Sequence, residues 1–181
     1  MNAFETLGLP PRLTIRAEEV NDAFRESGKS LHPDAGGDER EFARLREAHA
    51  ILASPSRRLR HWLETHGITV ETRGAVDSQV MDLFATVGDV SQRAEAIVRR
   101  RQDTKSALGL ALLEKETQHS REEVERALAT LARAISTQCE EFSDYQAAAA
   151  PDAVRASTSV RNLAFLEKWQ AGLRSLYARL V

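Results

Sequence analysis

The chain has 181 residues, of which 42% are apolar and 29% are charged, and its formal net charge at pH 7 is −2. This composition predicts a folded protein with a buried core, and the slightly acidic balance argues against a dedicated nucleic-acid-binding protein. No apolar run reaches the roughly 20 residues that cross a bilayer, and the first residues lack a basic segment followed by an apolar run. Cys139 is the only cysteine, which excludes an intrachain disulfide and a metal cage built from cysteines. We therefore expect neither a membrane segment nor a secretory signal, and we expect a reducing, cytoplasmic setting.

Hydrophobic periodicity predicts helix nearly throughout the first 66 residues, with Gly and Pro marking the ends. A short first turn around Phe4 and Leu7 ends at Gly8, and a longer helix runs from about Ala17 to Leu31. The next two helices are expected over Phe42 to Leu52 and from Ser54-Pro55 to Gly67.

Residues 67–76, GITVETRGAV, carry two glycines and no helical stripe, so we expect a linker there. Three longer helical patterns follow in residues 77–181. The first runs from Val76 and is expected to continue past Gly109 to Leu113, with a bend near Asp103-Thr104. The second is expected to begin at Ser120, with Glu123 completing a capping box. The last begins near Pro151, and three such helices with short connections predict a small bundle.

One polar stretch interrupts the helical pattern, because residues 31–38 read LHPDAGGD. The simplest interpretation is a turn in which Pro33 stops one helix and Asp34 or Asp38 caps the next. The alternative is a binding loop. Two helices paired as a hairpin bury their apolar faces against each other and leave the loop in water. Pro33 then restricts the conformation of His32, and Asp34 offers a carboxylate to an arginine of a partner.

A set of residues between Phe4 and Gly67 follows a known order and approximate spacing. They are Phe4, Leu7-Gly8, Ala23-Phe24-Arg25, Leu31 to Asp34, Phe42, Leu45, Glu47-Ala48 and Ile51-Leu52. With these residues the stretch from Phe4 to Gly67 resembles a J-domain, the module that docks on DnaK-type chaperones and stimulates their ATP hydrolysis. The resemblance implies that His32, Pro33 and Asp34 bind the chaperone, and that the ATPase site belongs to the partner.

Three longer segments read FETLGLPPRLTI, SPSRRLRHWLETHGI and VRNLAFLEKW. They are similar to segments of HscB, the J-protein of bacterial iron–sulfur cluster assembly. This resemblance implies an all-α protein with a J-domain over residues 1–66, a linker over 67–76 and a three-helix bundle over 77–181. It also implies a DnaK- or HscA-type ATPase as partner and the cluster scaffold IscU as client.

The family's second chaperone contact is a basic face on the helix before the loop. Arg25 and Lys29 lie four residues apart and can share one face of that helix. Several acidic residues surround them in sequence, so we expect weaker electrostatic steering than in a lysine-rich member. The alternative is that both side chains simply solvate the helix surface.

The family binds its client through an apolar patch on the first and last bundle helices. Phe165 is the strongest candidate, because it is offset from the leucine stripe of its helix and can remain exposed. The alternative for these side chains is burial in the bundle core. The candidate client-binding residues are Val80, Met81, Leu83, Phe84 and Phe165.

We expect no metal, no cofactor and no enzymatic activity. The five histidines form no pair at metal-ligand spacing with a suitable partner, and no Walker-type glycine loop occurs. Two alternatives to HscB-like client delivery remain. One is a J-protein with an unrelated client, and the other is a structural or adaptor protein that does not productively stimulate an ATPase.

Overall fold

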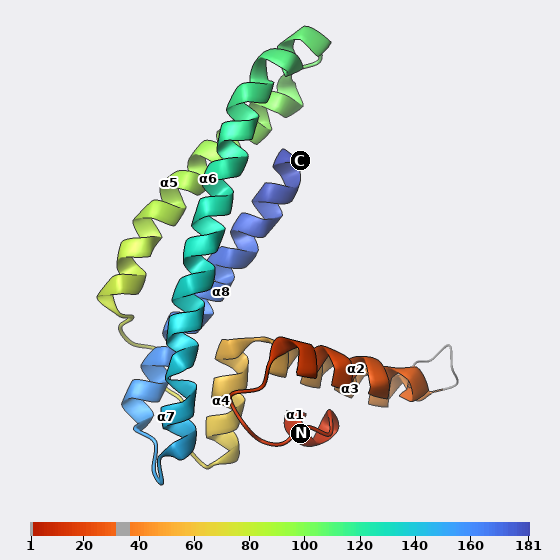
Figure 1. The fold of residues 1–181 in the computed structure, drawn as a ribbon, viewed down its shortest axis with the longest axis vertical. Coiled ribbons are helices and arrows are strands. Elements are labelled where there is room, and N and C mark those ends of the chain that lie inside the picture. The colour runs from red at the N-terminus through yellow and green to blue at the C-terminus, as the bar shows by residue number, and fades with distance from the viewer. Residues whose placement is uncertain (1, 32–36) are drawn as a thin grey trace. The chain divides into compact units, whose positions relative to one another are not determined.

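A computed structural model describes residues 2–31 and 37–181, and every regular element within them is a helix (Figure 1). The predicted all-α fold is therefore confirmed. No described helix combines the length and the hydropathy that a membrane span requires. The helices are α1 (Ala3–Thr6), α2 (Ala17–Leu31), α3 (Glu39–Ala53), α4 (Pro55–Thr65), α5 (Ser78–Asp103), α6 (Ala107–Glu140), α7 (Phe142–Ala147) and α8 (Ala153–Leu180).

The chain forms two compact units, and the long helices α6 and α8 each contribute to both. The first unit consists of Met1–Ala75 and Gln138–Ala164, and the second of Val76–Thr137 and Phe165–Val181. Residues 67–75, predicted as a linker, thus belong to the first unit together with part of the predicted bundle.

Helix ends in the N-terminal part follow the sequence signals. The Asp38 side chain accepts hydrogen bonds from the backbone N–H groups of Arg40 and Glu41, so Asp38 caps α3. Ser54 caps α4, and Pro55 occupies its first turn. Gly67 has a φ of 73°, a conformation that favours glycine after a helix end.

Helices α2 and α3 lie side by side and contact each other through aromatic rings. The rings of Phe24 and Phe42 are 6.4 Å apart, and those of Phe24 and His49 are 4.5 Å apart. His49 Nε2 also lies 2.9 Å from Asn21 Oδ1. His49 is therefore a packing residue of the hairpin.

A buried arginine ties the first unit together. Arg58, on α4, is only 7% exposed, and its Nη1 atom donates to the carbonyls of Ile15 and Leu52 at 3.2 Å and 3.1 Å. Its guanidinium carbon lies 5.6 Å from the centre of the Phe142 ring. The N-terminal helices and α7 are thus connected through one side chain.

Residues 71–75 are held by a second arginine. Arg161, on α8, donates to the backbone carbonyls of Glu71 at 2.8 Å and Ala75 at 3.0 Å. The Glu71 N–H in turn donates to the Ser157 hydroxyl at 3.0 Å. These contacts supply partners to backbone groups that lie outside any helix.

The second unit is built from α5, the first part of α6 and the end of α8, which surround a common core. Its core contains only aliphatic side chains among the described buried residues. They are Val80, Val87, Val90, Ala94, Val98, Val124, Ala127, Leu131, Leu166, Leu173, Leu176 and Leu180.

The predicted boundary between the first two bundle helices is wrong. Helix α5 ends at Asp103, where Thr104 adopts an extended backbone and its hydroxyl donates to the Arg100 carbonyl at 2.7 Å. The Ser106 hydroxyl accepts from the Gly109 N–H at 3.0 Å, at the start of α6. Ser120 lies inside α6 and is 3% exposed, so the Ser120–Glu123 pattern is not a capping box.

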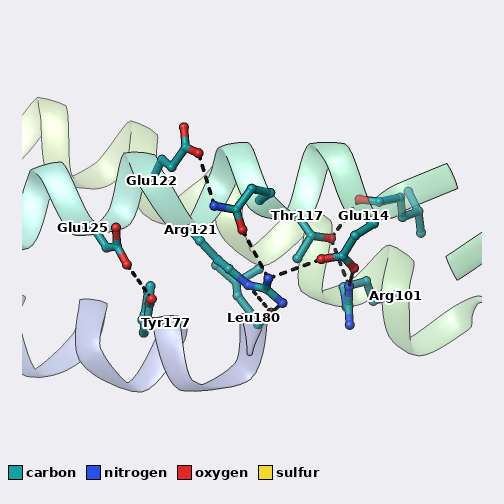
Figure 2. A network of polar contacts seen from close by, with 10 residues as sticks. Arg101, Glu114, Thr117, Arg121, Glu122, Glu125, Tyr177 and Leu180 are labelled. Carbon is teal, nitrogen blue, oxygen red and sulfur yellow. Dashed lines mark hydrogen bonds and ion pairs between the residues drawn. The ribbon is translucent and has the colours of Figure 1, made fainter. Parts of the chain in front are cut away.

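The end of α8 is anchored to α6 by polar contacts (Figure 2). Arg121 donates to the Leu180 carbonyl through Nε at 2.8 Å and Nη2 at 2.6 Å. The Tyr177 hydroxyl donates to Glu125 at 2.5 Å, and this bond raises the pKa of Tyr177. The positively charged Arg121 side chain thus binds a carbonyl at the C-terminus of α8, which is the negative end of that helix's dipole.

We predict that His61 makes stability dependent on pH. Its Nε2 atom accepts a hydrogen bond from the Ala3 N–H at 3.0 Å, which requires the neutral ring, and burial lowers the pKa of His61. Because the unfolded chain binds this proton more readily, the free energy of unfolding should decrease as pH falls through about 6.5. Urea denaturation between about pH 8 and about pH 5 measures this dependence.

The matched variants for this test are His61→Gln and His119→Gln. A glutamine oxygen at position 61 can accept the same bond without titrating, so His61→Gln should flatten the pH dependence. His119 lies on an exposed part of α6, and His119→Gln is the control for the loss of an imidazole elsewhere in the chain. An unaltered pH profile for His61→Gln would contradict the assignment.

Candidate functional site

The three residues of the predicted chaperone-binding motif, His32, Pro33 and Asp34, lie outside the described residues. Both flanks of the motif are described. Helix α2 ends at Leu31, and α3 begins directly after its cap, Asp38. The motif therefore lies in the connection between two paired helices.

The predicted basic face on α2 carries its own counter-charges. Arg25 forms an ion pair with Asp22, and Lys29 forms one with Glu26 at 2.6 Å. All four side chains are largely exposed. Alternating charges along a helix surface produce a weaker long-range field than an unbroken basic patch, so this face offers little steering to an acidic partner.

An apolar groove lies on the second unit, between α5 and α8. We call it the α5–α8 groove. Its cavity volume is about 330 Å³, and it is lined by Val76, Met81, Phe84, Phe165, Lys168 and Trp169.

Three side chains that the sequence predicted for client binding meet in this groove. Met81, Phe84 and Phe165 remain 53%, 56% and 43% exposed. The rings of Phe84 and Phe165 lie 5.7 Å and 5.9 Å from the ring of Trp169, which connects the two walls. Exposed aromatic and methionine side chains gathered in a concavity are typical of protein-binding surfaces.

The other two predicted residues do not line the groove. Val80 is 3% exposed and lies in the core, so it offers almost no surface to a partner. Leu83 packs partly against the same core. On α5, each residue is rotated by about 100° from the next, which turns these two side chains away from the face that carries Met81 and Phe84.

The sequence did not predict Trp169, Lys168 or Val76 as client-binding residues, although all three line the groove. A usable signal for Trp169 existed, because it follows Phe165 by four residues and therefore shares its helix face. The described residues contain no group of three His, Cys, Asp or Glu side chains that could hold a metal ion. The groove can therefore bind through apolar contact and one ammonium group.

Comparison with known proteins identifies relatives of the chain, although no family model matches it. A co-chaperone protein HscB homologue from Vibrio vulnificus (strain YJ016) is 32% identical over 93 residues, 46% of this chain and 53% of that protein. The chain thus matches about half the length of this curated relative. A second HscB homologue, from Shewanella oneidensis, is 26% identical over 187 residues, 94% of this chain and 93% of that protein. The chain is similar to an HscB co-chaperone homologue over nearly its full length.

The fold agrees with this assignment. The solved structure of chaperone HscB from Vibrio cholerae covers all of both chains with a TM-score of 0.58 and 19% sequence identity. The chain is also similar to DnaJ chaperones of Oryza sativa and Arabidopsis thaliana, at 36% and 34% identity over 55 residues, which is 30% of this chain and 13% of each of those proteins. The resemblance to HscB-type J-domain co-chaperones is therefore confirmed. The relatives are named as chaperones and co-chaperones, in agreement with the prediction that the chain is not an enzyme.

We predict that two neighbouring residues of α8 differ sharply in their contribution to stability. Leu166 is 0% exposed, whereas Phe165 is 43% exposed. Leu166→Ala should lower the free energy of unfolding by about 2–5 kcal/mol, because it leaves a cavity in the core. Phe165→Ala should lower it by about 1 kcal/mol or less. Urea denaturation of both variants measures the difference, and equal losses would show that Phe165 is a core residue.

Proposed function

We propose that this HscB homologue is a J-domain co-chaperone that docks on a DnaK- or HscA-type ATPase in the cytoplasm. It binds through His32, Pro33 and Asp34, stimulates ATP hydrolysis and delivers a client, for which the iron–sulfur scaffold IscU is the candidate. The similarity to an HscB co-chaperone homologue over 94% of the chain is the observation that carries this proposal.

The position of the motif supports its proposed docking role. The motif occupies a short connection between the end of α2 and the Asp38 cap of α3. Pro33 restricts the backbone at His32, and the Asp34 carboxylate can form a charge-assisted pair with an arginine of the ATPase. Docking then stabilises the hydrolysis-competent conformation of the partner, which requires contacts that the other conformation lacks.

The α5–α8 groove is the proposed client site. Met81, Phe84 and Phe165 present apolar surface that the fold leaves uncovered. Burial of such side chains at the centre of an interface contributes most of the affinity in protein complexes. The ATPase-docking motif and the client groove lie in separate segments of the chain, so each can be tested without altering the other.

The docking proposal predicts that His32→Gln removes ATPase stimulation. The wild-type protein should raise the single-turnover ATP hydrolysis rate of a DnaK- or HscA-type chaperone several-fold, and His32→Gln should leave that rate at its basal value. His119→Gln, on the exposed surface of α6, is the matched control and should stimulate like wild type. Full stimulation by His32→Gln would place docking elsewhere.

A specific observation favours one alternative function. Arg25 and Lys29 are each paired with a carboxylate of their own helix, so the face that assists chaperone docking is nearly neutral. A protein with a weak docking face can act as an adaptor without stimulating hydrolysis. Absence of stimulation by the wild-type protein, tested with each DnaK-type chaperone of the source organism, would favour the adaptor.

The client proposal predicts that Phe165→Ala weakens retention of a purified IscU-type scaffold. Loss of this ring from the groove should reduce affinity by about tenfold, the effect typical of a central aromatic residue. Val154→Ala is the control, because Val154 is 75% exposed on α8 but does not line the groove. Pull-down followed by titration measures the change, and an unaltered affinity would remove Phe165 from the client site.

A further inference from the structure

One charged side chain lies at the α5–α8 groove. Lys168 is exposed, and within the part of the chain that the structure describes it is the groove's only charged lining residue. Its ammonium makes no ion pair or hydrogen bond with any described residue. An apolar concavity bordered by an unpaired cation can select its occupant by charge as well as by shape.

Local geometry places the ammonium beside the most exposed ring of α8. Lys168 follows Phe165 by three residues, so the two side chains share one helix face. Three acidic residues directly adjoin lining residues in sequence, and none of them lines the groove. They are Asp77, Asp82 and Glu167. The charge offered at the groove wall is therefore positive, although the whole chain carries a net charge of −2.

We propose that the client segment bound in this groove presents a large apolar side chain next to a carboxylate. The apolar group packs against Met81, Phe84 and Phe165, and the carboxylate binds the Lys168 ammonium at the rim. This inference rests on the proposed function, because it assumes that the groove is the client site. It adds the chemistry of the segment that the site accepts.

Electrostatics and packing favour this occupant over a purely apolar one. When a client covers the aromatic walls, water is removed from around the ammonium, and an unpaired buried cation is costly. A carboxylate from the client offsets that cost through a charge-assisted hydrogen bond. A basic residue at the same point would be repelled, so Lys168 also discriminates against basic segments. Met81 adapts to different apolar shapes, which leaves the charge as the specific element.

The test compares substitutions at Lys168 with the same substitutions at Lys105, an exposed lysine that does not line the groove. With a purified IscU-type scaffold as the probe, Lys168→Met should weaken binding about threefold to tenfold, and Lys168→Glu should weaken it further. The loss should shrink in high salt, because salt screens the ion pair. Lys105→Met and Lys105→Glu should bind like wild type.

Failure of this inference is distinguishable from failure of the proposed function. If Phe165→Ala weakens scaffold binding while both Lys168 variants bind like wild type, the groove is the client site but the carboxylate is not required. That outcome overturns the inference and leaves the proposed function intact. If the scaffold does not bind the wild-type protein at all, delivery of IscU is excluded and a second probe decides the inference.

The second probe is a random peptide library displayed on phage and selected against the full chain. Peptides that depend on Phe165 should combine an aromatic or aliphatic residue with Asp or Glu. The acidic preference should disappear on Lys168→Met and reverse to Lys or Arg on Lys168→Glu. Selection of apolar peptides without any acidic preference, or of no Phe165-dependent peptides, overturns the inference.

Discussion

The rotation of about 100° per residue along a helix is the constraint on which the second unit depends. On α8, Leu166 and Leu173 must face α5 and α6 to close an aliphatic core. Their burial forces Phe165 and Lys168 onto a different face of the same helix, where the groove forms. The apolar surface offered to a partner is thus a geometric consequence of the packing that holds the unit together. A substitution that shifts the register of α8 would disturb both the aliphatic core and the groove.

The first unit is organised by arginine side chains that donate to backbone carbonyls. Arg58 connects the N-terminal helices, and Arg161 holds residues 71–75 against the beginning of α8. Carbonyls outside helices have no helical partner, and one guanidinium can bind several of them at once. This explains why residues 67–75 belong to a compact unit although their sequence resembles a linker.

The sequence predicted those helix ends that depend on strong local signals. Ser54-Pro55 and Gly67 bracket α4 as expected, because proline and glycine restrict the backbone locally. Between α5 and α6 the sequence predicted a bend near Asp103-Thr104 but not the end of the helix, since this break uses Thr104 and Ser106 hydroxyls rather than glycine or proline.

The residues of the candidate site also divide into those that the sequence identified and those that only the packing of the helices reveals. Family resemblance located Phe165, and helix geometry correctly suggested that it stays exposed. Periodicity could not separate Val80 from Met81, because which of two adjacent apolar residues faces the core depends on how α5 packs against its neighbours. The contribution of Lys168 is visible only once α5 and α8 are placed together.

The two tryptophans of the chain give each compact unit its own optical reporter. Trp62 is buried in the first unit, and its indole N–H donates to the Pro11 carbonyl at 3.2 Å. Trp169 stands in the groove of the second unit, between two phenylalanine rings. In a chain where phenylalanine replaces Trp62, the remaining indole fluorescence would follow occupancy of the groove without any attached dye.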